Sequence, residues 1–135
     1  DDMVKVKAAK KGDLLELDGK PNVLGGPSFS YSALEMFMMA PDFAVLVAGD
    51  SGIVVYHEGK GGKSRVLLLV GGSSSDLLRG AEESARGAGT IKITLEASPD
   101  SPVLPDLESA GYRRAGDVAN YFGKDRPALF LEKIL

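Results

Sequence analysis

Cysteine is absent from the 135 residues, and its absence removes several classes of chemistry at once. No disulfide, thiolate metal site or cysteine nucleophile can form. The single histidine, His57, excludes a metal site built from several histidines of one chain. A Ser-His-Asp triad could use only that histidine. We therefore expect no metal in this protein.

Long apolar runs are missing as well. The longest, Phe43–Ala48 and Val66–Val70, have the length of a strand. A membrane-spanning helix needs about 20 apolar residues. The start of the chain shows no signal-peptide pattern. The sequence therefore predicts a cytoplasmic protein with no membrane partner.

The chain also lacks a strong net charge of either sign. Sixteen basic and 19 acidic side chains give a net charge of −3, which provides no general attraction for nucleic acid. Hydrophobic residues make up 44% and charged residues 26%, as in ordinary globular proteins. The length predicts a single domain over residues 1–135.

Alternating and helical hydrophobic patterns predict an α+β fold. The expected strands are Val4–Ala8, Phe43–Ala48, Ile53–His57, Arg65–Val70, Thr90–Ala97, Tyr112–Ala115 and Ala128–Leu135, and the expected helices are Lys10–Leu17, Ala33–Met39, Asp76–Arg86 and Leu104–Ala110. Ser30 is the expected N-cap of the second helix. The segment Arg65–Ala97 forms a βαβ unit with parallel strands, and the remaining strands are expected to be antiparallel.

The loop Gly71–Ser75 follows a buried strand and opens a helix. Backbone N–H groups in such a loop, together with the helix dipole, suit a phosphate or pyrophosphate. Asp76 would compete for the same amides. The alternative is a simple turn in which a serine caps the helix.

Two side chains are candidates for acid–base chemistry. Glu96 lies at the carboxyl end of a strand of the βαβ unit, where ligand crevices form and where a carboxylate can act as a general base. Tyr121 precedes Phe122 before the last strand, and its hydroxyl can serve as an acid. The alternatives are a solvated glutamate and an aromatic pair that caps the core.

The order of elements and the last third of the chain together resemble the GNAT N-acetyltransferase superfamily, over nearly the full length. The similar segments are Leu95-Glu96-Ala97, Ser109-Ala110-Gly111-Tyr112, Tyr121-Phe122 and Ala128-Leu129-Phe130-Leu131-Glu132-Lys133. The resemblance implies a mixed, twisted sheet of about six or seven strands with helices on both faces. It also implies transfer of an acetyl group from acetyl-CoA, as cosubstrate, to an amine.

The resemblance further implies where acetyl-CoA binds. It would lie between Arg65–Val70 and Thr90–Ala97. The implied cofactor-binding residues are Leu69 and Val70 for pantetheine and Gly71, Gly72, Ser73, Ser74 and Ser75 for pyrophosphate. Glu96 stands at the position of the base, and Tyr121 or water would be the acid. The acceptor is a small-molecule amine or a peptide N-terminus.

Two departures from the family pattern support an alternative. The loop Gly71–Ser75 is several residues shorter than the family's phosphate loop and has no basic residue. Leu107 stands where the similar family members have a tyrosine that serves as the general acid. The chain could instead be a catalytically degenerate binding or assembly module. It would then bind a partner or form a homodimer, through Met36–Met39 if that segment is exposed rather than core. A phosphate-binding regulatory domain is a third interpretation.

Overall fold

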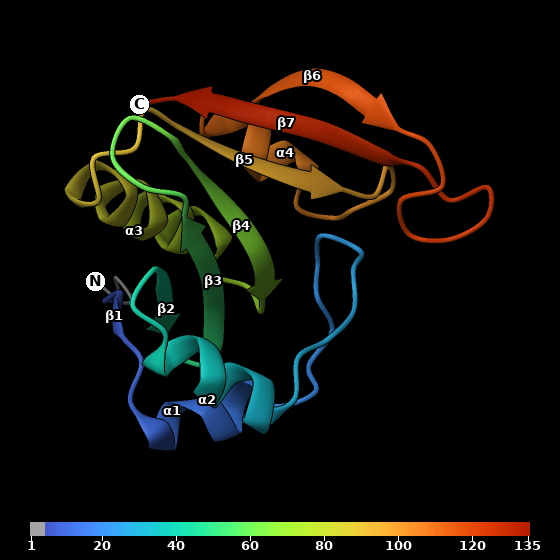
Figure 1. The fold of residues 1–135 in the computed structure, drawn as a ribbon. Helices are drawn as coiled ribbons and strands as arrows, with labels where there is room; N and C mark the ends of the chain where they lie inside the picture. The colour runs from blue at the N-terminus through green and yellow to red at the C-terminus, as the bar shows by residue number, and fades with distance from the viewer. Residues whose placement is uncertain (1–4) are drawn as a thin grey trace.

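The computed structural model describes residues 5–135, and it has the expected order of elements (Figure 1). In chain order the elements are β1 (Lys7–Ala8), α1 (Lys11–Leu17), α2 (Tyr31–Met39), β2 (Phe43–Ala48), β3 (Ser51–His57), β4 (Lys63–Val70), α3 (Ser74–Gly87), β5 (Lys92–Ala97), α4 (Leu104–Ser109), β6 (Arg113–Val118) and β7 (Ala128–Ile134). None of the described helices is long and apolar enough to cross a membrane. Residues 5–135 also hold no cluster of three metal-ligating side chains.

The strands of the described part of the chain form one sheet of seven, in the order β1-β2-β3-β4-β5-β7-β6. Among the strands of residues 5–135, only β4 and β5 run parallel, and every other neighbouring pair is antiparallel. The predicted βαβ unit and the antiparallel remainder are therefore confirmed. Helix α3 makes the crossover between the two parallel strands.

Helices cover both faces of the sheet, as the family resemblance implied. On one face α3 and α4 pack on the sheet through buried residues that include Leu77, Leu78, Ala81 and Leu107. On the other face α1 and α2 bury Leu14, Leu17 and Leu34 against the strands. The helical spacing of these residues places them on one side of each helix, and this burial stabilises short helices that would be marginal alone.

Element boundaries differ from the predictions by a few residues. Strand β3 begins at Ser51, so the turn after β2 is shorter than expected. Strand β6 runs to Val118 because it pairs with β7 along the exposed edge, which no local hydrophobic pattern signals. The predicted N-cap Ser30 is confirmed, since its hydroxyl accepts a hydrogen bond from Ala33 N at 3.2 Å. Val4 of the first predicted strand lies outside the described residues.

A partly buried ion pair joins α3 to β7. Glu82 is 4% exposed, and its Oε1 accepts a hydrogen bond from Lys133 Nζ at 2.8 Å. Its Oε2 accepts one from the Tyr112 hydroxyl at 3.0 Å. Burial and the charge of Glu82 raise the pKa of Tyr112, so its hydroxyl remains a donor. Both carboxylate oxygens of Glu82 are thereby paired, as a buried charge requires.

A polar network around His57 joins β3 and β4 to the end of α3. His57 Nδ1 lies 2.6 Å from Ser64 Oγ, and Nε2 lies 2.9 Å from Ser84 Oγ. Thr90 Oγ1 donates to Ala85 O and lies 2.7 Å from Ser64 Oγ. Ser64 therefore donates to Thr90 and accepts from Nδ1–H, and in a neutral ring Nε2 accepts from Ser84. The network fits a neutral imidazole.

Candidate active site

The two parallel strands pair only at their beginnings. Three pairs of residues join β4 to β5, and the last of these pairs is Arg65 with Thr94. Beyond that register β4 continues to Val70 and β5 to Ala97, and the two strands diverge (Figure 1). We call the space between the diverging strands the fork. The backbone groups that face the fork cannot pair strand to strand, so they need other partners.

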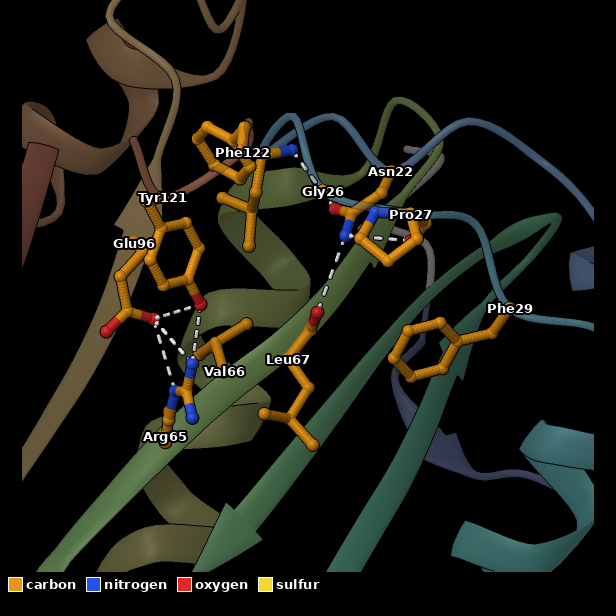
Figure 2. A pocket seen from close by; sticks show the side chains of 11 residues that line it. Asn22, Gly26, Pro27, Phe29, Arg65, Val66, Leu67, Glu96, Tyr121 and Phe122 are labelled. Carbon is orange, nitrogen blue, oxygen red and sulfur yellow. Dashed lines mark hydrogen bonds and ion pairs between the residues drawn. The ribbon is translucent and has the colours of Figure 1, made fainter. Parts of the chain in front are cut away.

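A cavity of about 190 Å³ lies where the fork begins, next to the last paired residues of the two strands. Three polar side chains from distant parts of the sequence meet in its wall: Arg65 from β4, Glu96 from β5 and Tyr121 from the loop between β6 and β7 (Figure 2). The rest of the lining is mostly apolar or amide and consists of Asn22, Leu24, Gly26, Pro27, Phe29, Val66, Leu67 and Phe122.

The three polar side chains form a closed triangle (Figure 2). Arg65 Nε and Nη2 each lie 3.1 Å from Glu96 Oε1. Arg65 Nη2 also donates to the Tyr121 hydroxyl at 2.6 Å, and that hydroxyl donates to Glu96 Oε1 at 3.3 Å. Within residues 5–135, the side-chain bonds to Glu96 all end on Oε1. The arrangement fixes the carboxylate while leaving Oε2 out of the triangle.

The surroundings set the protonation of this triangle. Burial raises the pKa of the Tyr121 phenol, the charge of Glu96 raises it further, and the charge of Arg65 offsets part of the increase. Burial alone would lower the pKa of Arg65, but Glu96 and Tyr121 outweigh burial and raise it. At neutral pH the phenol therefore carries its proton and the guanidinium its charge.

The structure brings together the two candidate catalytic residues of the sequence, Glu96 and Tyr121. Arg65 was not predicted as a site residue. Its signal was an arginine that opens an otherwise apolar strand, and only the register with β5 places it beside Glu96. Leu107, which stands where the family has a tyrosine, is fully buried in the core and cannot contribute a proton.

The fork is filled by a segment of the chain itself. Residues Asn22–Leu24, from the loop between α1 and α2, run along the edge of β4, and we call them the strap. Val23 N donates to Leu69 O at 2.8 Å. Asn22 Oδ1 accepts from Leu69 N at 3.3 Å. Asn22 Nδ2 donates to Leu67 O at 3.4 Å, a contact that Figure 2 shows. Main-chain and side-chain amides of the strap thus pair with β4 inside the fork.

The strap also bonds to the β5 side. Ser98, the residue after β5, donates its backbone N–H to Leu24 O at 2.7 Å, and the Ser101 hydroxyl donates to Val23 O. Leu24 is 2% exposed and belongs to the core beneath the fork. Gly25 has φ +108°, and a Cβ there would lie 2.8 Å from Ser98 Cβ, so the turn after the strap requires glycine.

These contacts involve the residues that the family resemblance assigns to the cofactor. Both backbone polar groups of Leu69 pair with the strap. Val70 is buried and lies in register with Gly52 of β3. In the following loop, Ser73 N donates to Ser51 Oγ at 3.2 Å, and Gly71 packs closely on the same serine. The loop is therefore tied to β3.

The start of α3 offers backbone amides but no positive side chain. Ser74 begins the helix, and the helix dipole favours an anion there. Gly71, Gly72 and Ser74 share a shallow pocket with the carboxylate of Asp106. Asp76 in the first turn is paired with Arg79. The fit to a pyrophosphate is therefore by main-chain donors alone.

The segment Met36–Met39, a candidate partner surface, divides between core and solvent. Met36 is 71% and Met39 73% exposed. Phe37 and Met38 pack against the core under α1 and α2. The interpretation of this segment as core therefore holds for two of its four residues.

Comparison with solved structures identifies the fold. The chain is similar to the ribosomal-protein-alanine N-acetyltransferase of Brucella melitensis, with 17% identity over 98% of this chain and 100% of that one and a TM-score of 0.76. It is similar to the spermidine N-acetyltransferase of Vibrio cholerae, which was solved with CoA and spermine, with 15% identity, 97% and 95% coverage and a TM-score of 0.73. The aminoglycoside 6'-N-acetyltransferase of Enterococcus faecium gives 18% identity, 96% coverage of both chains and a TM-score of 0.71.

No family model and no curated protein matches the sequence. At these identities the likeness establishes the fold. The chain has the fold of the GNAT N-acetyltransferases, in a divergent form, as the sequence motifs predicted.

Proposed function

We propose that this chain is a cytoplasmic, single-domain N-acetyltransferase that moves an acetyl group from acetyl-CoA to an amine held beside Glu96. The observation that carries the proposal is the triangle of Arg65, Glu96 and Tyr121 on the wall of the cavity at the fork. A carboxylate can accept a proton from an amine, and a protonated phenol can donate one to a leaving group.

Each residue of the triangle has a distinct role. Glu96 takes the proton of the attacking amine on Oε2, because Arg65 and Tyr121 bond to Oε1. Tyr121 is the proton donor, since its raised pKa keeps the phenol protonated. Tyr121 gives its proton to the sulfur of the leaving CoA thiolate. A half-turn of the Glu96 carboxyl group then brings its protonated oxygen to the Tyr121 hydroxyl, where Oε1 lies at 3.3 Å before the reaction, and the proton passes to the phenolate. Arg65 is a positioning residue that holds Glu96 Oε1 and the Tyr121 hydroxyl oxygen in place.

The edge of β4 is suited to an amide-bearing arm. Leu67 O, Leu69 N and Leu69 O already pair with amide groups, those of the strap. The pantetheine arm of acetyl-CoA carries amides of the same kind, and its phosphates would meet the main-chain donors at Gly71–Ser75. When bound, acetyl-CoA supplies the activated acetyl group and a thiol leaving group. The chain's own part is to orient it and to manage the proton.

Release of the CoA thiol tests the proposed activity. The chain has no cysteine, so a thiol reagent reports only on CoA. Purified protein is mixed with acetyl-CoA and, in turn, spermidine, an aminoglycoside and a peptide with a free N-terminus, the kinds of amine named for the structural neighbours. We expect thiol release with one of these classes, abolished in Glu96→Gln. Equal release by the wild type and Glu96→Gln would contradict the assignment of the base.

A second candidate is the non-catalytic module, and a specific observation favours it. The strap occupies the fork, and Gly71–Ser75 contains no cation. If the fork never opens, the domain keeps the fold without binding acetyl-CoA, and its role is to bind a partner. Binding of acetyl-CoA separates the two candidates. Micromolar affinity supports the enzyme, and no binding at millimolar ligand supports the module.

A further inference from the structure

We infer that the strap Asn22–Leu24 is an intramolecular competitor of acetyl-CoA, and that it must leave the fork before the donor binds. The inference rests on the proposed function. Its basis is the pairing of the strap with β4 at the backbone groups that the pantetheine arm would use.

The strap presents the same kinds of groups as an amide-bearing ligand. A carbonyl-type oxygen, Asn22 Oδ1, meets Leu69 N, and a main-chain N–H, that of Val23, meets Leu69 O. A primary amide N–H reaches Leu67 O. A buried strand edge cannot leave these groups unpaired without cost. The edge therefore holds either the strap or a ligand with equivalent amides.

The strap belongs to a loop that is closed at its base. Gly19 N donates to Phe29 O at 2.9 Å, which links the two ends of the loop beside α1 and α2. The loop carries Gly25 and Gly26 directly after the strap. Withdrawal therefore requires breaking the contacts within the fork, while the base of the loop and the two helices keep their places.

Withdrawal of the strap would open two sites together. Asn22, Leu24 and Gly26 line the cavity beside Glu96. Val23 borders the shallow pocket at Gly71 and Gly72. The donor site and the amine site thus share one movable wall, and a donor that displaces the strap also enlarges the space next to the base.

Calorimetric titration with CoA tests the inference. Asn22→Ala removes both side-chain contacts to β4, and Val23→Pro removes the main-chain N–H that Leu69 accepts. Each variant should destabilise the state in which the strap fills the fork. CoA should then bind about tenfold more tightly than to wild type, equivalent to about 1.4 kcal/mol. Ser28→Ala, at an exposed position in the same loop, is the matched control and should bind as wild type does.

The outcomes separate this inference from the proposed function. Tighter binding by both strap variants, with Ser28→Ala unchanged, supports the inference. Measurable binding that is equal or weaker in the strap variants overturns it and leaves the proposed function standing. If neither wild type nor any variant binds CoA at millimolar concentration, the proposed function fails, and the inference fails with it.

Hydrogen exchange on the unaltered protein gives a second, independent readout. In the CoA-bound protein the Val23 amide should exchange faster than in the free protein, because it loses its hydrogen bond to Leu69 O. The Leu69 amide should stay protected, because a ligand oxygen replaces Asn22 Oδ1. A Val23 amide that stays equally protected at saturating CoA would overturn the inference whatever the variants show.

Discussion

Leu24 anchors the strap in the core, and its replacement by alanine tests whether the strap is closed in solution. The side chain is 2% exposed and belongs to the cluster beneath the fork. Truncating a buried leucine to alanine costs about 2 to 5 kcal/mol, according to how far the cavity collapses. Gly25 and Gly26 follow directly and allow some relaxation, so we expect about 2 to 3 kcal/mol.

The assay is urea unfolding, and a leucine elsewhere in the chain provides the control. With a urea m-value of about 1 to 3 kcal/mol/M, Leu24→Ala should lower the midpoint by about 0.7 to 3 M. Leu15 of α1 is 69% exposed, and Leu15→Ala should change stability by less than about 0.5 kcal/mol. If the two variants unfold at the same urea concentration, Leu24 is not held in the core and the closed strap is wrong.

Three further predictions follow from the site and the polar networks. Glu96→Gln should lower kcat at least about 100-fold with little change in the KM for acetyl-CoA, because it removes the base and keeps the shape; a change in KM alone would refute the role. Glu82→Ala should lower the free energy of unfolding by about 3 kcal/mol, since it leaves Lys133 without its buried partner. Glu83 is exposed, so Glu83→Ala is the control and should have almost no effect. Equal shifts of the urea midpoint in the two variants would contradict the role of the Glu82–Lys133 pair. Burial lowers the pKa of His57, and the charge of Asp42 offsets part of the decrease. The unfolded chain therefore binds this proton at a higher pH than the folded chain, so stability present above about pH 6.5 should be lost as pH falls through the folded pKa. Urea midpoints at pH 7.5 and 5.5 should differ more in wild type than in His57→Gln, and an identical difference would exclude His57 as the cause.

Local patterns were sufficient to predict most of the fold. Strand β2 is a short, unbroken apolar run and helix α2 carries hydrophobic residues at helical spacing, and the structure places both within two residues of the expected bounds. The parallel pair followed from a strand, a helix and a strand in succession. The exposed strand β6 was shorter in the prediction because its residues have no buried face, and only pairing with β7 defines its length.

The site was predictable only in part. Glu96 could be placed at a strand end, and Tyr121 was suggested by the family motif. The position of Arg65 depends on the register between β4 and β5, which sequence spacing does not specify. The strap was missed because Asn22–Leu24 reads as an ordinary Gly- and Pro-rich loop. Its hydrogen bonds to Leu69 join residues that are distant in sequence, and no local rule reports them.

Amide NMR shifts during a titration with acetyl-CoA would test the central claim most directly. If the fork is the donor site, the amides of Leu67, Leu69 and Val23 should shift together and saturate with a single affinity, and those at Gly71–Ser75 should follow. If these amides keep their positions at millimolar acetyl-CoA, or if the shifts gather elsewhere on the molecule, the fork is not an acetyl-CoA site and the acetyltransferase assignment is wrong.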